Sequence, residues 1–211
     1  MNEFAARVQQ LNVQRAMDAL RANRMEPFYL ERADQVRSFV QQLLPAGCTV
    51  ACGGSMTLAE TGVTALLEEG GYNYLDRSRT DRKDWTELFR RSFSADWYLT
   101  SANAITLNGE LFNVDGNSNR VAAIAFGPSH VLVIAGVNKL VRDLDAAEER
   151  VRTLAAPANA MRLSCQTPCT VTGKCQDCHS PGRICCDTLI CRQQRDPDRI
   201  KVLLVGEPLG L

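Results

Sequence analysis

Apolar side chains recur along this chain in two patterns, a helical period and short uninterrupted runs. Apolar residues three or four positions apart predict helices over residues 3–24, 33–44, 57–69 and 84–92. Short runs rich in β-branched and aromatic residues predict strands at residues 28–30, 49–52 and 72–75. Because helices and strands alternate, this part of the chain predicts an α/β domain with a largely parallel sheet.

From Trp97 onward the pattern changes to short apolar runs separated by Asn/Gly turns. These runs predict strands at residues 97–101, 104–107, 110–113, 121–125 and 131–135. Asn108-Gly109 lies between two of them and indicates a β-hairpin, so we expect the sheet to be mixed. A long polar helix is predicted from Lys139 into the 150s, and residues 200–205 form a last buried strand.

The composition is that of a globular protein, with 211 residues, 45% hydrophobic and 23% charged. We expect a single domain over residues 1–211, with a metal-binding, cysteine-rich surface loop at residues 165–191. Lys plus Arg and Asp plus Glu balance at 24 each, which excludes a polybasic nucleic-acid or membrane-binding tail. Neither a secretory signal nor an apolar run of ~20 residues is present, so a cytoplasmic location is predicted.

Cysteines concentrate near the C-terminus. Seven of the nine lie there: Cys165, Cys169, Cys175, Cys178, Cys185, Cys186 and Cys191. A reducing cytoplasm disfavours disulfides, so metal binding is the favoured interpretation, with redox-active or idle thiols and a disulfide scaffold as alternatives. Cys175 and Cys178 form a Cys-x-x-Cys pair, which Cys169 and Cys185 flank on either side. Four thiolates suit either zinc or an iron–sulfur cluster. The pair followed by His179 also matches a haem-attachment signature, but attachment normally needs export.

A glycine-containing turn follows the strand at residues 49–52. Gly53 and Gly54 let backbone N–H groups approach a ligand, and Ser55 and Thr57 offer hydroxyls or cap the next helix. The turn matches neither of the two common nucleotide-binding glycine motifs. Glu60, one helical turn further on, is a candidate base or nucleophile, or simply favours the helix dipole.

A second polar loop covers residues 113–120. Its candidate ligand-binding residues are Asn113, Asp115, Gly116, Asn119 and Arg120. Arg120 is a candidate partner for a carboxylate or phosphate, and Asp115 is a second candidate catalytic carboxylate. The same residue types also form ordinary turns, so ligand loop and structural turn both stay open.

These motifs together resemble the LUD-domain family of lactate-utilisation proteins. The resemblance rests on Gly54-Ser55-x-Thr57-x-x-Glu60-x-Gly62, Thr100-x-Ala102-x-Ala104-Ile105-Thr106, Gly109-x-Leu111-x-Asn113-x-Asp115-Gly116-x-x-Asn119-Arg120 and Gly136-x-Asn138-Lys139. The run from Pro168-Cys169 to Ile184-Cys185 resembles the cysteine-rich C-terminal extension of one branch of that family.

The resemblance implies a three-layer α/β domain similar to the sugar-phosphate isomerase and CoA-transferase group, with an anion-accepting pocket. It also implies a link to oxidation of lactate or related hydroxy acids, alongside iron–sulfur partner proteins. The family-like segment favours Cys169, Cys175, Cys178 and Cys185 as metal ligands, with Cys165 and Cys191 as substitutes. The redox setting favours a 4Fe–4S cluster over zinc.

Three functions therefore stay open. The leading one is a hydroxy-acid utilisation protein with a four-cysteine centre and a pocket for a small carboxylate or phosphate. The second is a non-catalytic sensing or scaffold subunit with structural zinc, and the third is an isomerase or transferase using Glu60 or Asp115. The residues assign no substrate, reaction or oligomeric state, and self-association is left open.

Overall fold

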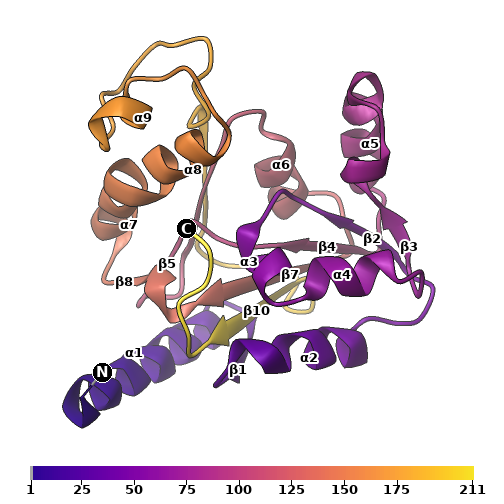
Figure 1. Ribbon diagram of the computed structural model, residues 1–211. Helices are drawn as coiled ribbons and strands as arrows, with labels where there is room; N and C mark the ends of the chain where they lie inside the picture. Colours follow the sequence, from indigo (N-terminus) through magenta and orange to yellow (C-terminus); the bar gives the residue numbers. More distant parts are fainter. Residues whose placement is uncertain (1) are drawn as a thin grey trace.

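The computed structural model describes residues 2–211 and is built around a six-stranded sheet in which every neighbouring pair is parallel (Figure 1). In spatial order the strands are β1 (Glu26–Leu30), β10 (Ile200–Val205), β7 (His130–Gly136), β4 (Trp97–Thr100), β2 (Thr49–Cys52) and β3 (Asn73–Leu75). The predicted C-terminal strand thus lies between the first strand and β7. Parallel pairing brings the carboxyl ends of all six strands to one edge.

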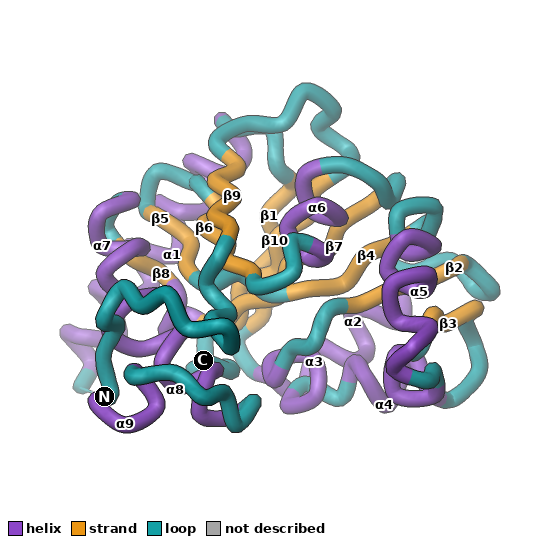
Figure 2. Tube along the Cα trace, turned by 90° about the horizontal axis from the view of Figure 1, so that it is seen from above, coloured by secondary structure: helices purple, strands orange, loops and turns teal. Residues whose placement is uncertain are grey.

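Four further strands form a second sheet beside the first (Figure 2). Their order is β8 (Leu140–Val141), β5 (Ala104–Thr106), β6 (Leu111–Asp115) and β9 (Asp187–Cys191). β5 and β6 are the predicted antiparallel hairpin, and its turn residue Gly109 has φ +76°. The hairpin therefore belongs to a separate mixed sheet.

Nine α-helices among residues 2–211 surround the two sheets. They are α1 (Glu3–Ala22), α2 (Val36–Leu43), α3 (Met56–Glu60), α4 (Val63–Glu68), α5 (Trp85–Ser92), α6 (Asn119–Ala125), α7 (Leu144–Arg150), α8 (Ala156–Arg162) and α9 (Cys169–Thr172). A five-residue π-helical turn, Val151–Ala155, connects α7 to α8.

Alternate residues of the central strands enter two different apolar cores. In β10, Val202 and Leu204 pack in a core shared with α1, α5 and α6, whereas Leu203 packs with α2, α3 and α4. This is the period-two alternation of a strand that is covered on both faces. The predicted three-layer α/β fold is confirmed.

Two sequence predictions on the second half of the chain were wrong. Residues 121–125, predicted as a strand, form part of helix α6. The helix begins here because one carboxylate oxygen of Asp115 accepts hydrogen bonds from backbone N–H groups in the first turn of the helix, those of Arg120 and Val121, while the other accepts from Gly116 N–H. The short alanine-rich run suits either element, and this cap decides between them. The helix predicted from Lys139 begins only at Leu144, since residues 140–141 pair with β5 and Asp143 caps the helix.

Two further segments differ from their predictions. The helix predicted over residues 57–69 is interrupted at Thr61-Gly62, where Gly62 adopts φ +71°. The cysteine segment, predicted as a loop, contains α9 and strand β9, which pairs antiparallel with β6. None of the helices within residues 2–211 has the length and apolar character needed to cross a bilayer.

Candidate functional site

A cavity of about 230 Å³ lies where loops leave the carboxyl ends of β2, β4 and β7 and meet the loop after β6. Ligands of open α/β sheets commonly bind at this edge. Of the predicted ligand residues, those lining the cavity are Gly53, Gly54, Ser55, Thr57, Asp115, Gly116, Asn119 and Arg120. The two loops singled out in the sequence are therefore walls of one cavity.

The cavity wall carries more positive than negative charge. Arg77, Arg120, Lys139 and Arg162 line it, and Asp115 contributes the single acidic side chain among the lining residues. The oxygens of Asp115 accept hydrogen bonds from the backbone N–H groups of Gly116, Asn117, Arg120 and Val121. This carboxylate is thus occupied in shaping the loop, and the surplus positive charge favours an anion.

Arg120 is a partly buried cation that holds the loops in place. Its guanidinium donates to the carbonyl oxygens of Ser101 (3.2 Å) and Val114 (2.6 Å) and to the amide oxygens of Asn113 (2.8 Å) and Asn103 (3.0 Å). All four acceptors are neutral, so the charge of Arg120 acts on the cavity without an ion-pair partner. Asn113, a predicted ligand residue, does not line the cavity and instead supports Arg120.

Arg77 is a cavity cation that the sequence analysis missed. Its guanidinium lies against Gly54, where an added Cβ would come within 2.9 Å of Nη2, and 5.1 Å from the centroid of the Trp85 ring. Within the described chain, no hydrogen bond or ion pair engages this guanidinium. An arginine held over an aromatic ring with free donors is suited to grip a carboxylate or phosphate.

Lys139 is the second missed residue, since the sequence placed it only in a family-like motif. Its side chain is 3% exposed, and its Nζ donates to Ser101 Oγ at 2.8 Å and Thr57 Oγ1 at 3.3 Å. Burial, together with repulsion from Arg150 and Arg120, lowers the pKa of Lys139 to about 7. The amine therefore titrates near neutral pH.

Glu60, one of the two candidate catalytic carboxylates, does not line the cavity. Its Oε2 accepts a hydrogen bond from the backbone N–H of Gly210 at 2.7 Å, and the side chain lines a separate surface depression with Arg32 and Arg37. Glu60 and Asp115 thus line different cavities, and each carboxylate accepts hydrogen bonding from backbone N–H. Ser55 accepts from Leu58 N–H and acts as the N-cap of α3.

The four predicted metal ligands Cys169, Cys175, Cys178 and Cys185 line one small cavity of about 20 Å³ against α8. The two proposed substitutes, Cys165 and Cys191, do not line it, and Cys191 is buried in β9. All nine cysteines are free thiols. Folding therefore gathers the four residues that the family-like segment favours.

The thiols of this cavity, which we call the cysteine cavity, have polar neighbours. Thr167 Oγ1 lies 3.3 Å from Cys169 Sγ, and Asp177 N–H donates to Cys175 Sγ at 3.3 Å. Hydrogen bonding from Ser180 lowers the pKa of Cys178, whereas burial raises the pKa of Cys185. Hydrogen bonds of this kind favour thiolates and tune iron–sulfur centres.

The distances between the cysteine sulfurs help to decide whether zinc or an iron–sulfur cluster would fit the cysteine cavity. Zn–S bonds of about 2.3 Å in a tetrahedron place sulfurs roughly 3.8 Å apart. Over residues 2–211 no three His, Cys, Asp or Glu side chains are gathered closely enough for a single ion. The four-thiolate set suits an iron–sulfur cluster chemically, and the loop must open to admit one because the present space is that of about one water molecule.

The two cavities adjoin each other. Ile184 lines both, and α8 separates them, with Asn159 facing the anion cavity and Ala160 the cysteine cavity. An added Cβ at Gly116 would lie 3.0 Å from Ile184 Cα, and Cys186 N–H donates to Asp115 O at 2.9 Å. The cysteine segment is thus part of the wall of the anion cavity.

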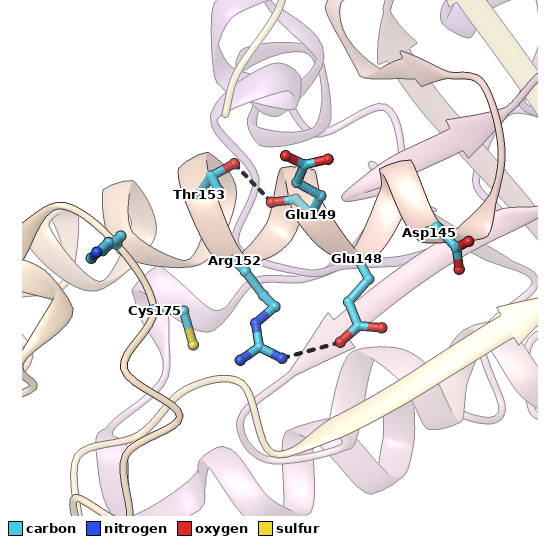
Figure 3. A pocket seen from close by; sticks show the side chains of 7 residues that line it. Asp145, Glu148, Glu149, Arg152, Thr153 and Cys175 are labelled. Carbon is cyan, nitrogen blue, oxygen red and sulfur yellow. Dashed lines mark hydrogen bonds and ion pairs between the residues drawn. The ribbon is translucent and has the colours of Figure 1, made fainter.

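A shallow groove of about 390 Å³ is lined by α7, the π-helical turn and, from the cysteine segment, Lys174 and Cys175 (Figure 3). Figure 3 shows Arg152 between the sulfur of Cys175 and the carboxylate of Glu148, with which it forms an ion pair at 3.3 Å. Asp145 and Glu149 complete an acidic rim. This face differs in charge from the cationic cavity on the other side of α8.

The family model described as LUD domain matches residues 13–205. The crystal structure of a DUF162 family protein from Deinococcus radiodurans is similar to this chain, with a TM-score of 0.53 and 13% identity over 94% of this chain and 98% of that one. That identity supports similarity of fold alone. A structure of eIF2B beta from Chaetomium thermophilum matches with a TM-score of 0.37 and 18% identity over 53% of this chain and 39% of that one, too low to carry an argument. The comparison with curated proteins finds no match.

Proposed function

Since this chain belongs to the LUD-domain family, we propose that it takes part in hydroxy-acid utilisation by binding a small carboxylate of the lactate type. The binding site is the cationic cavity at the carboxyl edge of the central sheet, which we call the anion cavity. A four-cysteine metal centre, favoured to be a 4Fe–4S cluster, lies on the other side of α8.

The observation that carries this proposal is the charge of the anion cavity. Four cationic side chains line it, and the only acidic side chain among its lining residues, Asp115, accepts hydrogen bonds from backbone N–H groups. Arg77 offers free donors for a carboxylate, while Ser101 and Thr57 offer hydroxyls that match a neighbouring hydroxyl or carbonyl oxygen. A volume of about 230 Å³ suits a small molecule.

In the metal centre, Cys169, Cys175, Cys178 and Cys185 would hold the group. A bound iron–sulfur cluster supplies one-electron transfer, and iron–sulfur partner proteins would be its redox partners. Arg183 keeps the ligand-bearing segment in place, because its guanidinium donates to the carbonyl oxygens of Cys178 (2.7 Å) and Cys185 (3.0 Å).

Calorimetric titration with L-lactate and with neutral lactamide tests the anion cavity. We expect lactate to bind and lactamide to bind far more weakly, because only lactate carries the charge. Arg77→Gln should weaken lactate binding roughly 10- to 100-fold, the effect of losing about 1.5–3 kcal/mol from a charged hydrogen bond. Arg79→Gln is the matched control, since that side chain is 71% exposed and pairs with Asp76. Equal affinities for lactate and lactamide would contradict the proposal.

Anaerobic purification with iron, sulfide and zinc analysis tests the metal centre. Cys178→Ser should lose the metal, whereas Cys186→Ser should retain it, because Cys186 is exposed and does not line the cysteine cavity. A colourless protein that holds zinc under these conditions would favour the scaffold alternative with a structural zinc. Equal metal loss in both variants would reject the four-residue ligand set.

A further inference from the structure

Ser101 and Lys139 are in direct contact in the anion cavity, and the proposed binding function assigns no reaction to this contact. Ser101 directly follows β4 at the carboxyl edge of the sheet and is partly exposed in the anion cavity. Lys139 lies behind it, 3% exposed, with its Nζ 2.8 Å from Ser101 Oγ. Ser101 therefore lines the cavity, and the amine of Lys139 contacts its hydroxyl.

The partners of Lys139 are unusual for a buried lysine. Buried ammonium groups are normally paired with a carboxylate. Within residues 2–211, however, Lys139 has no ion pair, and its Nζ contacts two hydroxyls, those of Ser101 and Thr57. Two further cations, Arg120 and Arg150, act on it, and Glu60 is the opposing charge. These surroundings favour the neutral amine, which accepts a proton.

We propose that Ser101 is a nucleophile activated by Lys139, and that it accepts the acyl group of a small anionic acyl donor, such as an acyl phosphate or a charged ester or thioester. The inference rests on the anion cavity of the proposed function, because Arg77 and Arg120 supply the charge that would retain the donor's anionic group. A serine with a lysine base is a known alternative to the serine–histidine arrangement.

The chemistry balances without a redox partner. Ser101 Oγ forms a bond to the acyl carbon while its proton passes to Lys139 Nζ. The bond from the acyl carbon to the leaving oxygen or sulfur then breaks. The leaving group takes the proton from Lys139, or it departs as an anion and Lys139 releases its proton to solvent, so that the amine is neutral again. Water hydrolyses the Ser101 ester with Lys139 again as the base, which yields a carboxylic acid and free Ser101.

The test uses acetyl phosphate and intact-protein mass spectrometry after a short incubation, with peptide mapping to locate the acetyl group. We expect an acetyl group on Ser101, absent in Ser101→Ala and reduced at least tenfold in Lys139→Met. Ser129→Ala and Lys83→Met are controls, because both residues are exposed and neither lines the anion cavity. In the unaltered protein the acetylation rate should rise from about pH 6 to about pH 8, as expected for a neutral amine base. This last measurement stays informative if Lys139→Met fails to fold.

Binding of inorganic phosphate, measured by calorimetry, separates the two proposals. Phosphate binding with no acetyl group on Ser101 would overturn the nucleophile and leave the anion cavity intact. An acetyl group on Lys139 in place of Ser101 would overturn the assigned roles. Absence of phosphate and lactate binding would reject the proposed function as well.

Discussion

Protonation of Lys139 should make anion binding depend on pH. Its pKa is about 7, lowered from 10.5 chiefly by burial and then by Arg150 and Arg120, with Glu60 opposing the shift. Below this pKa the side chain adds a positive charge to the wall of the anion cavity, and above it the charge is lost. Lactate binding should therefore strengthen as the pH falls.

The size of the effect follows from Coulomb's law. A unit charge at roughly 6 Å from a bound carboxylate, with an effective dielectric constant of about 20, contributes about 2.8 kcal/mol, or a factor of about 100. Lys139 is mostly protonated at about pH 6 and still about one-tenth protonated at about pH 8. The affinity for lactate should therefore fall roughly tenfold between these two pH values. Lactate stays ionised throughout.

Calorimetric titration of lactate across this range measures the affinity. Repeating it in buffers with different ionisation enthalpies counts the protons taken up on binding, and we expect uptake of a fraction of a proton near pH 7. Lys139→Met should bind more weakly at low pH and show a flat profile. An affinity that is constant or rises with pH in the unaltered protein would refute this reasoning.

Three further predictions concern the loops that build the site. Gly109→Ala should destabilise the protein by more than the ~1–2 kcal/mol cost of positive φ, because its Cβ would lie 2.6 Å from the backbone of Ala19. Gly47→Ala is the control for thermal unfolding and should cost only that amount, because Gly47 has φ +74° and open space around it. Asp115→Ala removes a four-hydrogen-bond cap and should lower the melting temperature by several degrees and weaken lactate binding, which calorimetry and circular dichroism measure. Arg183→Gln should lower the metal content after anaerobic purification relative to Arg192→Gln, because Arg183 holds two cysteine carbonyls; equal contents would count against its role.

Most element positions could be predicted from local sequence patterns. The strands at residues 49–52 and 200–205 and the Asn108-Gly109 hairpin were confirmed, because a buried run or a turn dipeptide is a strong local signal. Residues 121–125 were mistaken for a strand, because the alanine-rich run has no clear period. The cap from Asp115 that decides the matter is a tertiary arrangement of the loop.

The site was predicted in part. The sequence placed Gly53, Gly54, Asp115, Gly116, Asn119 and Arg120 in two candidate ligand loops, and in the structure these residues line one cavity. Arg77 and Lys139 were missed, since neither stands out among 24 Lys and Arg residues until folding buries one and lays the other over Gly54. Glu60 lies outside the anion cavity and accepts a hydrogen bond from the backbone N–H of Gly210, a contact between distant segments that its position along a helix does not show.

By itself, the order of residues determined the α/β class, the two glycine-containing polar loops and the cysteine-rich segment, because each depends on neighbours within about ten positions. Only the tertiary structure decided that these loops line the same cavity and that Asp115 accepts hydrogen bonds from backbone N–H groups. It also decided that Lys139 is buried against hydroxyl groups and, among the described residues, forms no ion pair with a carboxylate. Burial and charge pairing depend on which distant segments meet, and parallel β-strand pairing brings those segments together across more than a hundred residues.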